Sequence, residues 1–271
     1  MRGTSSTSFA EVLRQAEAAP AADGAAPETE AEELFSVADA IDSSNQLVRT
    51  LSDAGRPAAV KEASVRSLFD GRVGPRTLEL TLEVVRRRWS EQEDVLDALE
   101  LLGVSALLDL ALREGVLEQI EGELFQVSRL IDSSGELTSA LDGARDEPGR
   151  RAQTLRRLLE GRVHPLTAIL AARAVGRRSE LKPARRVEEF ARFAADRRRR
   201  AFAEVASAVP LNESQQARLS AVLAGIYGRE VQLNLQVDPD VVGGLRIQVG
   251  DDLYDATVLA RLSRARSSLV A

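Results

Sequence analysis

The sequence contains no cysteine, a single histidine and few aromatic residues. Without cysteine, the chain can form neither a disulfide nor a thiolate metal site. A zinc site would need several carboxylates around His164, a ligand set that zinc rarely accepts. Because aromatic residues make up only 4% of the chain, we expect Leu, Val and Ala to fill its core. The composition therefore predicts no bound metal and helices that pack through aliphatic side chains.

Long apolar segments are also missing. A Ser/Thr run follows Arg2, and Glu11 interrupts any apolar stretch, so we expect no signal peptide. The most apolar segment, 99–112, contains Glu100 and Asp109 and is too short and too charged to cross a bilayer. We therefore expect a protein that is soluble in a reducing compartment, or one that is attached to a membrane only through partners.

The net charge of −6 argues against general nucleic-acid binding, but the charges are unevenly distributed. Residues 90–123 contain ten acidic residues and one Arg, whereas 177–200 contain ten basic and four acidic residues. We interpret the basic stretch as a solvated helix face, because all but two of the basic residues in the chain are Arg. The alternatives are a patch for nucleic acid or an acidic partner, and a pairing between the two stretches.

The chain contains an internal repeat. "LFSVADAIDSSNQLVRTL" (34–51) matches "LFQVSRLIDSSGELTSAL" (124–141) at nine of 18 positions, and 64–77 matches 154–167 at seven of 14. Both alignments have an offset of 90 residues. A fixed long offset indicates a duplicated folding unit, and two copies of it predict two tandem domains rather than a solenoid.

Each copy of the repeat reads as a series of short helices. Leu34, Val37 and Ile41 fall on one helical face, and the Ser-Ser that follows predicts a turn with an N-cap. Residues 8–17 predict a short amphipathic helix ahead of the first copy. The Ala-, Pro- and acid-rich segment 18–33 predicts a flexible or frayed linker.

Glycine and proline predict where the later helices of each copy end and begin. Gly71 and Gly161 suit helix C-termini, and the prolines four residues later suit the first turn of longer helices at 76–88 and 166–177. His164 lies in the second of these turns. We interpret it as a tolerated turn residue, because a catalytic base would need partners.

From about residue 201 the hydrophobic period changes. "AFAEVASAV" (201–209) predicts a strand, and the strict alternation of "EVQLNLQV" (230–237) predicts a half-buried one. Leu245, Ile247 and Val249 repeat this pattern, and Leu253-Tyr254 could form a short further strand.

Helices are expected to pack against this sheet. Asn212 and Gln215 form a capping-box pattern that opens the first helix, and Asp255 is placed to cap a final one. The apolar stripe of the first helix consists of Leu219, Val222, Leu223 and Ile226. The stripe of the final helix consists of Val258, Leu259, Leu262 and Ala265. The predicted order is β-α-β-β(-β)-α.

The stretch "VDPDVVGGLRIQVGDDLYDA" (237–256) carries five Asp and three Gly. Its spacing fits neither a dinucleotide fingerprint, nor a Walker A loop, nor a calcium loop. Asp238-Pro239 instead starts a turn, and Gly243-Gly244 allows backbone angles that other residues resist. We therefore predict a hairpin-like reversal that returns a strand to the sheet, and no catalytic residue.

At these residues the chain resembles the delta subunit of F-type ATP synthase, called the oligomycin-sensitivity-conferring protein in mitochondria. Residues 205–223 and 110–141 are also similar to that family. The family's Asp-x-Ser is Asp255-Ala256-Thr257 here, and the extra N-terminal bundle resembles a duplicated form found in some high-GC bacteria. The signature residues of the resemblance are Asp238, Pro239, Gly243, Gly244, Gly250, Asp255, Arg261 and Leu262.

The resemblance implies a mainly α fold of two tandem bundles of the six-helix type, followed by a small C-terminal α/β domain. We place a duplicated bundle at 1–104, the family's usual bundle at 105–196 and the α/β domain at 197–271. The extra bundle could hold a second alpha subunit, brace the b subunit or pack on the second bundle.

The implied function is that of a non-catalytic stator subunit without a cofactor. It would lie at the cytoplasmic face of the cell membrane, where it would link the alpha subunits of the catalytic head to the b subunit of the peripheral stalk. The signature residues would be structural or would dock the b subunit around 219–262. The implied contacts with alpha are Leu107, Leu110, Ala111, Leu166, Ile169, Leu170 and Ala174.

Two other functions remain as alternatives. One is a helical nucleic-acid or regulatory adaptor that uses the basic segment 177–200. The other is a nucleotide enzyme that uses the Gly/Asp turn.

Overall fold

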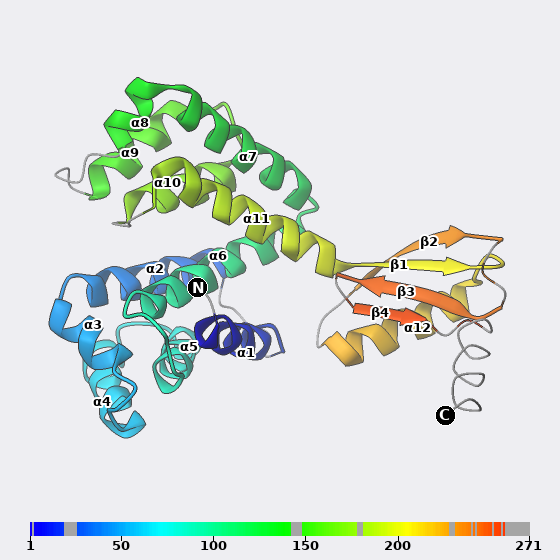
Figure 1. Cartoon of the computed structure of the whole chain (residues 1–271), viewed down its shortest axis with the longest axis horizontal. Helices are drawn as coiled ribbons and strands as arrows, with labels where there is room; N and C mark the ends of the chain where they lie inside the picture. The colour runs from blue at the N-terminus through cyan, green and yellow to red at the C-terminus, as the bar shows by residue number, and fades with distance from the viewer. Residues whose placement is uncertain are drawn as a thin grey trace. The chain divides into compact units, whose positions relative to one another are not determined.

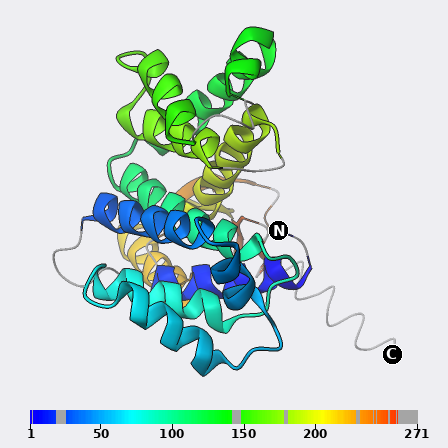
Figure 2. The same ribbon diagram turned by 90° about the vertical axis from the view of Figure 1, so that its left-hand side faces the viewer.

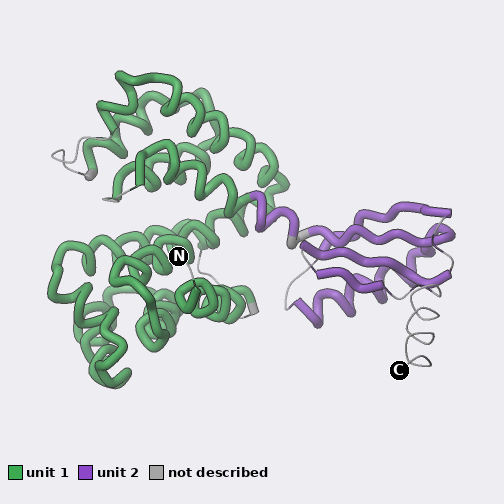
Figure 3. The backbone as a smooth tube through the Cα atoms, viewed as in Figure 1, with its two compact units in different colours: residues 1–194 green, residues 195–271 purple. Residues whose placement is uncertain are grey.

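The computed structural model describes residues 1, 3–18, 26–141, 148–177, 181–227, 231–239, 241, 243–250, 252–255 and 257. The chain divides into two compact units, Met1–Ala194 and Ala195–Ala271 (Figure 3). The helices that begin in the first unit follow in chain order (Figure 1). They are α1 (Thr4–Ala18), α2 (Pro27–Asp42), α3 (Asn45–Ser52), α4 (Ala58–Phe69), α5 (Pro75–Arg86), α6 (Asp94–Arg113), α7 (Leu117–Ser133), α8 (Gly135–Leu141), α9 (Pro148–Leu159), α10 (Pro165–Gly176) and α11 (Pro183–Ala201).

Helix α6 belongs to two bundles at once. Its first half packs into the core formed by α1–α5, for example through Leu99 and Leu102. Its second half packs into the core formed with α7–α11, through Leu107 and Leu108. We call α1–α6 the first bundle and α6–α11 the second bundle. The predicted fold class, with two bundles of the six-helix type, is therefore confirmed, and the bundles share a helix.

Helix α1 is the counterpart of the shared helix α6 in the first copy of the repeat. Thr4, where α1 begins, and Asp94, where α6 begins, are separated by the repeat offset of 90 residues. Helix α6 is thus the first helix of the second copy as well as the sixth of the first. The predicted boundary between residues 104 and 105 falls inside this helix. The division into three domains stays a prediction.

The expected turns of the repeat are confirmed in both copies. The Oγ of Ser44 accepts a hydrogen bond from Leu47 N (3.4 Å), and the Oγ of Ser134 accepts one from Leu137 N (3.2 Å). Gly71 has a φ of 71° just after α4, and Gly161 has a φ of 69° just after α9. These left-handed angles suit glycine, which carries no Cβ.

The linker predicted over 18–33 is wrong from Pro27 onward, because α2 begins there. Proline suits the first turn of a helix, and the acids Glu28 and Glu30 lie near the positive end of the helix dipole. Ala31 is fully buried. Burial of one face of α2 against α6 (Figure 2) therefore outweighs a composition that is typical of linkers.

The second unit contains a four-stranded sheet in the order β2-β1-β3-β4. Strand β2 is parallel to β1, whereas β3 is antiparallel to both β1 and β4. The core of the second unit contains Ala203, Val205, Leu223, Val231, Ile247 and Val249. The elements are β1 (Phe202–Ser207), α12 (Glu213–Tyr227), β2 (Gln232–Val237), β3 (Leu245–Val249) and β4 (Asp252–Asp255).

The capping box that was predicted at the start of α12 is confirmed. The side-chain amide oxygen of Asn212 accepts from Gln215 N, and that of Gln215 accepts from Asn212 N, both at 2.9 Å. Strands were correctly expected at all four positions. The final helix predicted after Asp255 lies outside the described residues, although Asp255 Oδ1 accepts from Thr257 N at 3.0 Å.

Two expectations about the sheet are wrong. The chain reverses after β2 and returns β3 to the sheet, as predicted, but the reversal is not a hairpin, because β1 lies between β2 and β3. The crossover through α12 places β2 on one edge of β1, and β3 takes the other. The apolar alternation of β2 also does not produce a half-buried strand, because β2 is an edge strand and Leu235 and Val237 are 37% and 56% exposed.

Candidate functional site

The predicted contact face on the second bundle is mostly core. Only Leu110 and Ile169 are partly exposed, where they pack against the edge of that core. A partner can therefore reach this face mainly through Leu110 of α6 and Ile169 of α10. The other five predicted residues are at most 6% exposed: Leu107, Ala111, Leu166, Leu170 and Ala174.

A carboxylate from α7 fixes the start of α10. Glu123 Oε2 accepts hydrogen bonds from His164 N (2.8 Å) and Thr167 Oγ1 (2.5 Å). Burial works to raise the pKa of Glu123, but hydrogen bonds from Thr167, Gln119 and His164 N outweigh it, so this pKa lies below its ordinary value. The Nδ1 of His164 accepts from Leu166 N (3.2 Å). His164 therefore caps helix α10, which is a more specific role than the tolerated turn residue that was predicted.

The first copy repeats this arrangement. Glu33 Oε2 accepts from Gly74 N (2.9 Å) and from Thr77 Oγ1 (2.6 Å) at the start of α5. Sequence reasoning missed this cap, although its signal was present. Both the Glu and the Thr recur at the offset of 90 residues, as Glu33 with Glu123 and Thr77 with Thr167.

A buried ion cluster joins the two bundles. Glu100 of α6 is fully buried and accepts from Arg173 Nε (3.0 Å), from Arg177 Nη1 (3.2 Å) and from Arg186. Arg177 also bonds Asp97 at 2.6 Å. Burial works to lower the pKa of Arg177, but Glu100 and Asp97 outweigh it and raise this pKa above its ordinary value. The guanidinium of Arg177 therefore stays charged inside the cluster.

This cluster confirms that the acidic and basic stretches pair, at Asp97 and Glu100 with Arg177 and Arg186. It also removes Arg177 and Arg186 from any basic patch, because both are buried. The nucleic-acid alternative therefore loses part of the segment on which it depends.

The signature residues of the second unit shape turns. Asp238 N donates to Ser207 O at 2.9 Å, and Pro239 lies in the turn that follows. Gly243, Gly244 and Gly250 have φ values of 67°, 84° and 59°. The glycines are therefore required by the backbone, as predicted. Arg261 and Leu262 lie outside the described residues.

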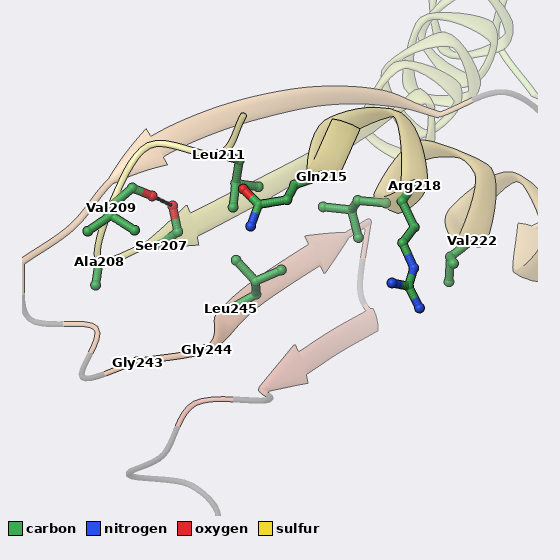
Figure 4. Close-up of a pocket in the computed structure, with 11 residues that line it drawn as sticks. Ser207, Ala208, Val209, Leu211, Gln215, Arg218, Val222, Gly243, Gly244 and Leu245 are labelled. Carbon is green, nitrogen blue, oxygen red and sulfur yellow. Dashed lines mark hydrogen bonds between the residues drawn. The ribbon is translucent and has the colours of Figure 1, made fainter. Parts of the chain in front are cut away.

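An apolar groove of about 470 Å³ opens beside the Gly243-Gly244 turn. Figure 4 shows the side chains of Leu211 and Leu245 between the start of α12 and β3. The apolar side chains that line it are Ala208, Val209, Leu211, Leu219, Val222 and Leu245. Of the stripe predicted to face the sheet, only Leu223 is buried, and Val222 and Ile226 are more than half exposed. Helix α12 thus presents apolar residues on two sides.

Among the described residues, no three His, Cys, Asp or Glu side chains are gathered in a way that could hold a metal ion. No helix in that part of the chain is long and apolar enough to span a bilayer.

Comparison with known proteins gives consistent matches. The family model described as ATP synthase delta (OSCP) subunit matches residues 104–269. The ATP synthase subunit delta of Beutenbergia cavernae is 39% identical over 269 residues, which cover 99% of each chain. That of Thermobifida fusca is 38% identical over 273 residues, again 99% of each. A chain of the Toxoplasma gondii mitochondrial ATP synthase hexamer aligns over 62% of this chain and 95% of its own at 25% identity, with a TM-score of 0.32.

Proposed function

The chain belongs to the ATP synthase delta (OSCP) subunit family, and from this premise we propose how its parts serve the enzyme. It is a stator subunit of the peripheral stalk and links the catalytic head to the membrane-anchored b stalk. This link stops the head from turning with the rotor, so that proton-driven rotation is coupled to ATP synthesis. The chain performs no bond chemistry and is a peripheral protein at the cytoplasmic face of the cell membrane.

The head side of the link is the face around Leu110 and Ile169, which receives an N-terminal segment of an alpha subunit. Both side chains pack against the core of the second bundle, to which the buried Leu107, Leu166 and Leu170 belong. A stator contact must dissociate slowly, and an apolar contact between helices serves that need.

The stalk side of the link is the apolar groove of the second unit, which receives the end of the b subunit. This groove is the observation that carries the proposal. Its turn is built from Asp238, Pro239, Gly243 and Gly244. Gly250 lies just before strand β4, and Asp255 is the last residue of that strand. An amphipathic helix with apolar side chains at intervals of three and four residues suits such a groove.

The stalk contact can be tested by measuring how the full chain binds the soluble part of the b subunit. We expect Val222→Asp to weaken binding at least about tenfold, because it places a charge in the apolar groove. Val60→Asp on α4 is the matched control, since Val60 is 44% exposed against 51% for Val222. Equal affinities for both variants would contradict the docking site.

The stator role itself can be tested in membrane vesicles stripped of this chain. Without it, we expect ATP synthesis driven by a proton gradient to be lost and to return when the purified chain is added back. Full synthesis in vesicles that lack the chain would contradict the stator role.

A further inference from the structure

The repeat allows the docking face of the second bundle to be compared with its counterpart in the first. An offset of 90 residues places Arg76, Glu79 and Glu83 of α5 at the positions of Leu166, Ile169 and Arg173 of α10. In each helix these three residues share one stripe, because residues three and four apart lie on the same face. The comparison rests on the proposed docking of an alpha-subunit segment at Ile169.

The stripe of α10 is apolar up to Arg173, and α2 covers Arg173. The guanidinium of Arg173 lies 4.7 Å from the ring centroid of Phe35 and bonds Asp39 at 2.8 Å, both residues of α2. The same side chain reaches Glu100. Helix α2 of the first bundle therefore bounds the partly exposed face of α10 at Arg173, four residues after Ile169.

The stripe of α5 carries only charged residues, and they are bonded within the first bundle. Arg76 Nε donates to Glu30 at 2.7 Å, and its Nη2 donates to the backbone oxygen of Ala16 in α1 at 2.8 Å. Glu79 and Glu83 both accept from Arg86. No apolar side chain of this stripe is left for a partner.

A further ion pair closes the seam between α1 and α5. Arg87, directly after α5, bonds Glu11 of α1 at 2.5 Å. Glu30 is largely buried, and burial raises its pKa although Arg76 works to lower it. Opening this seam to admit an apolar segment would leave the largely buried carboxylate of Glu30 without its partner Arg76, which is unfavourable. Residue 20, the counterpart of Leu110, lies outside the described residues.

We propose that the chain carries one docking face for an alpha-subunit segment and not two, so that duplication of the bundle did not duplicate the binding site. The second bundle binds the segment at Ile169. The first bundle closes its own seam with ion pairs and uses α2 to bound the face on α10. Its contribution is to hold α10 in place rather than to recruit a second alpha subunit.

The test is a calorimetric titration of the full chain with a synthetic peptide of the alpha subunit's N-terminal segment. We expect one peptide per chain. The matched variants are Ile169→Gln and Glu79→Gln, which place the same residue at equivalent positions of the two bundles. We expect Ile169→Gln to weaken binding about tenfold and Glu79→Gln to leave it unchanged. Thermal unfolding of each variant controls for loss of the fold.

The other outcomes have distinct meanings. Two peptides per chain, or weaker binding by Glu79→Gln, would overturn the single-site inference while leaving docking on the second bundle intact. No saturable binding of the peptide would remove the proposed head contact itself, and the inference with it.

Discussion

The two compact units expose their large apolar side chains very differently. Among the described residues of Met1–Ala194 the exposed ones are Met1, Val60, Leu130 and Leu181. In the described part of Ala195–Ala271, a much shorter unit, they are Val209, Val222, Ile226, Leu235, Val237, Leu253 and Tyr254. Single exposed apolar residues are normal on a protein surface, whereas a gathering of them indicates an interaction site.

The difference separates two mechanical tasks. The first unit buries its apolar residues in two cores that share α6, and it ties the bundles together through Glu100. Such a unit suits a stiff spacer. The second unit has one small core and leaves α12 and the edge strand β2 partly uncovered. Such a unit suits a surface that docks and becomes buried in the assembled enzyme.

The largest expected effect tests the stiff unit. The substitution Glu100→Gln removes the buried carboxylate that Arg173, Arg177 and Arg186 share. Because removal of one partner from a buried ion pair typically costs about 3–5 kcal/mol, we expect a loss of that order in the free energy of unfolding. Urea unfolding of the full chain, with separate probes in the two units, measures it. If the transition of the second unit shifts equally, the two units are not independent.

A smaller effect is expected at the centre of the shared helix. A Cβ at Gly103 would lie 2.5 Å from Cε1 of Phe35, whose ring lies against Arg173. Alanine is the better helix former by about 1 kcal/mol, but overpacking a core costs about 1–3 kcal/mol. We therefore expect Gly103→Ala to destabilise the first unit by about 1–2 kcal/mol. A stabilised variant would mean that the bundle junction is looser than the contact implies.

The corresponding glycine test in the second unit depends on backbone conformation. Gly243 has a φ of 67°, which costs a residue with a Cβ about 1 kcal/mol. We expect Gly243→Ala to lower the melting temperature of the second unit alone, and to weaken b-subunit binding only as far as the fold is lost. Weaker binding without a change in melting temperature would give this glycine a direct role in recognition.

Local patterns predicted much of this fold. The duplicated unit, the capping box at Asn212 and the glycines at Gly71 and Gly161 all depend on short-range chemistry that the sequence displays directly. The paired acidic and basic stretches were also visible as a hypothesis.

Long-range packing was not visible in the same way. No local signal shows that α6 serves two cores, or that five of the seven predicted contact residues lie inside the second one. An apolar residue on a helix looks the same whether it faces its own bundle or a partner. The same ambiguity explains Val222 and Ile226, which share a stripe with the buried Leu223 but are exposed.

The helix cap at Glu123 predicts a pH dependence for the first unit. The pKa of this carboxyl lies below its ordinary value of 4.5 when the protein is folded. Its contribution to stability is therefore complete above the unfolded pKa and is lost as the pH falls through the folded pKa. We expect Glu123→Gln to cost about 0.5–1 kcal/mol near neutral pH and nothing at strongly acid pH. The exposed Glu118 of the same helix provides the control, and a constant difference at every pH would contradict the assignment.

The smallest effect is expected where ion pairs are exposed. Glu188 bonds Arg185 and Arg192 of α11, both at 2.7 Å, and hydrogen bonds from these two arginines lower its pKa. Water and salt screen such a pair, so we expect Glu188→Gln to cause no resolvable change in urea unfolding. Glu188 and Glu100 each contact at least two arginines, and burial is the main difference between them. If Glu188→Gln and Glu100→Gln destabilise the first unit equally, the stability of that unit depends on the number of its ion pairs. Burial of the pairs would then not account for its stiffness.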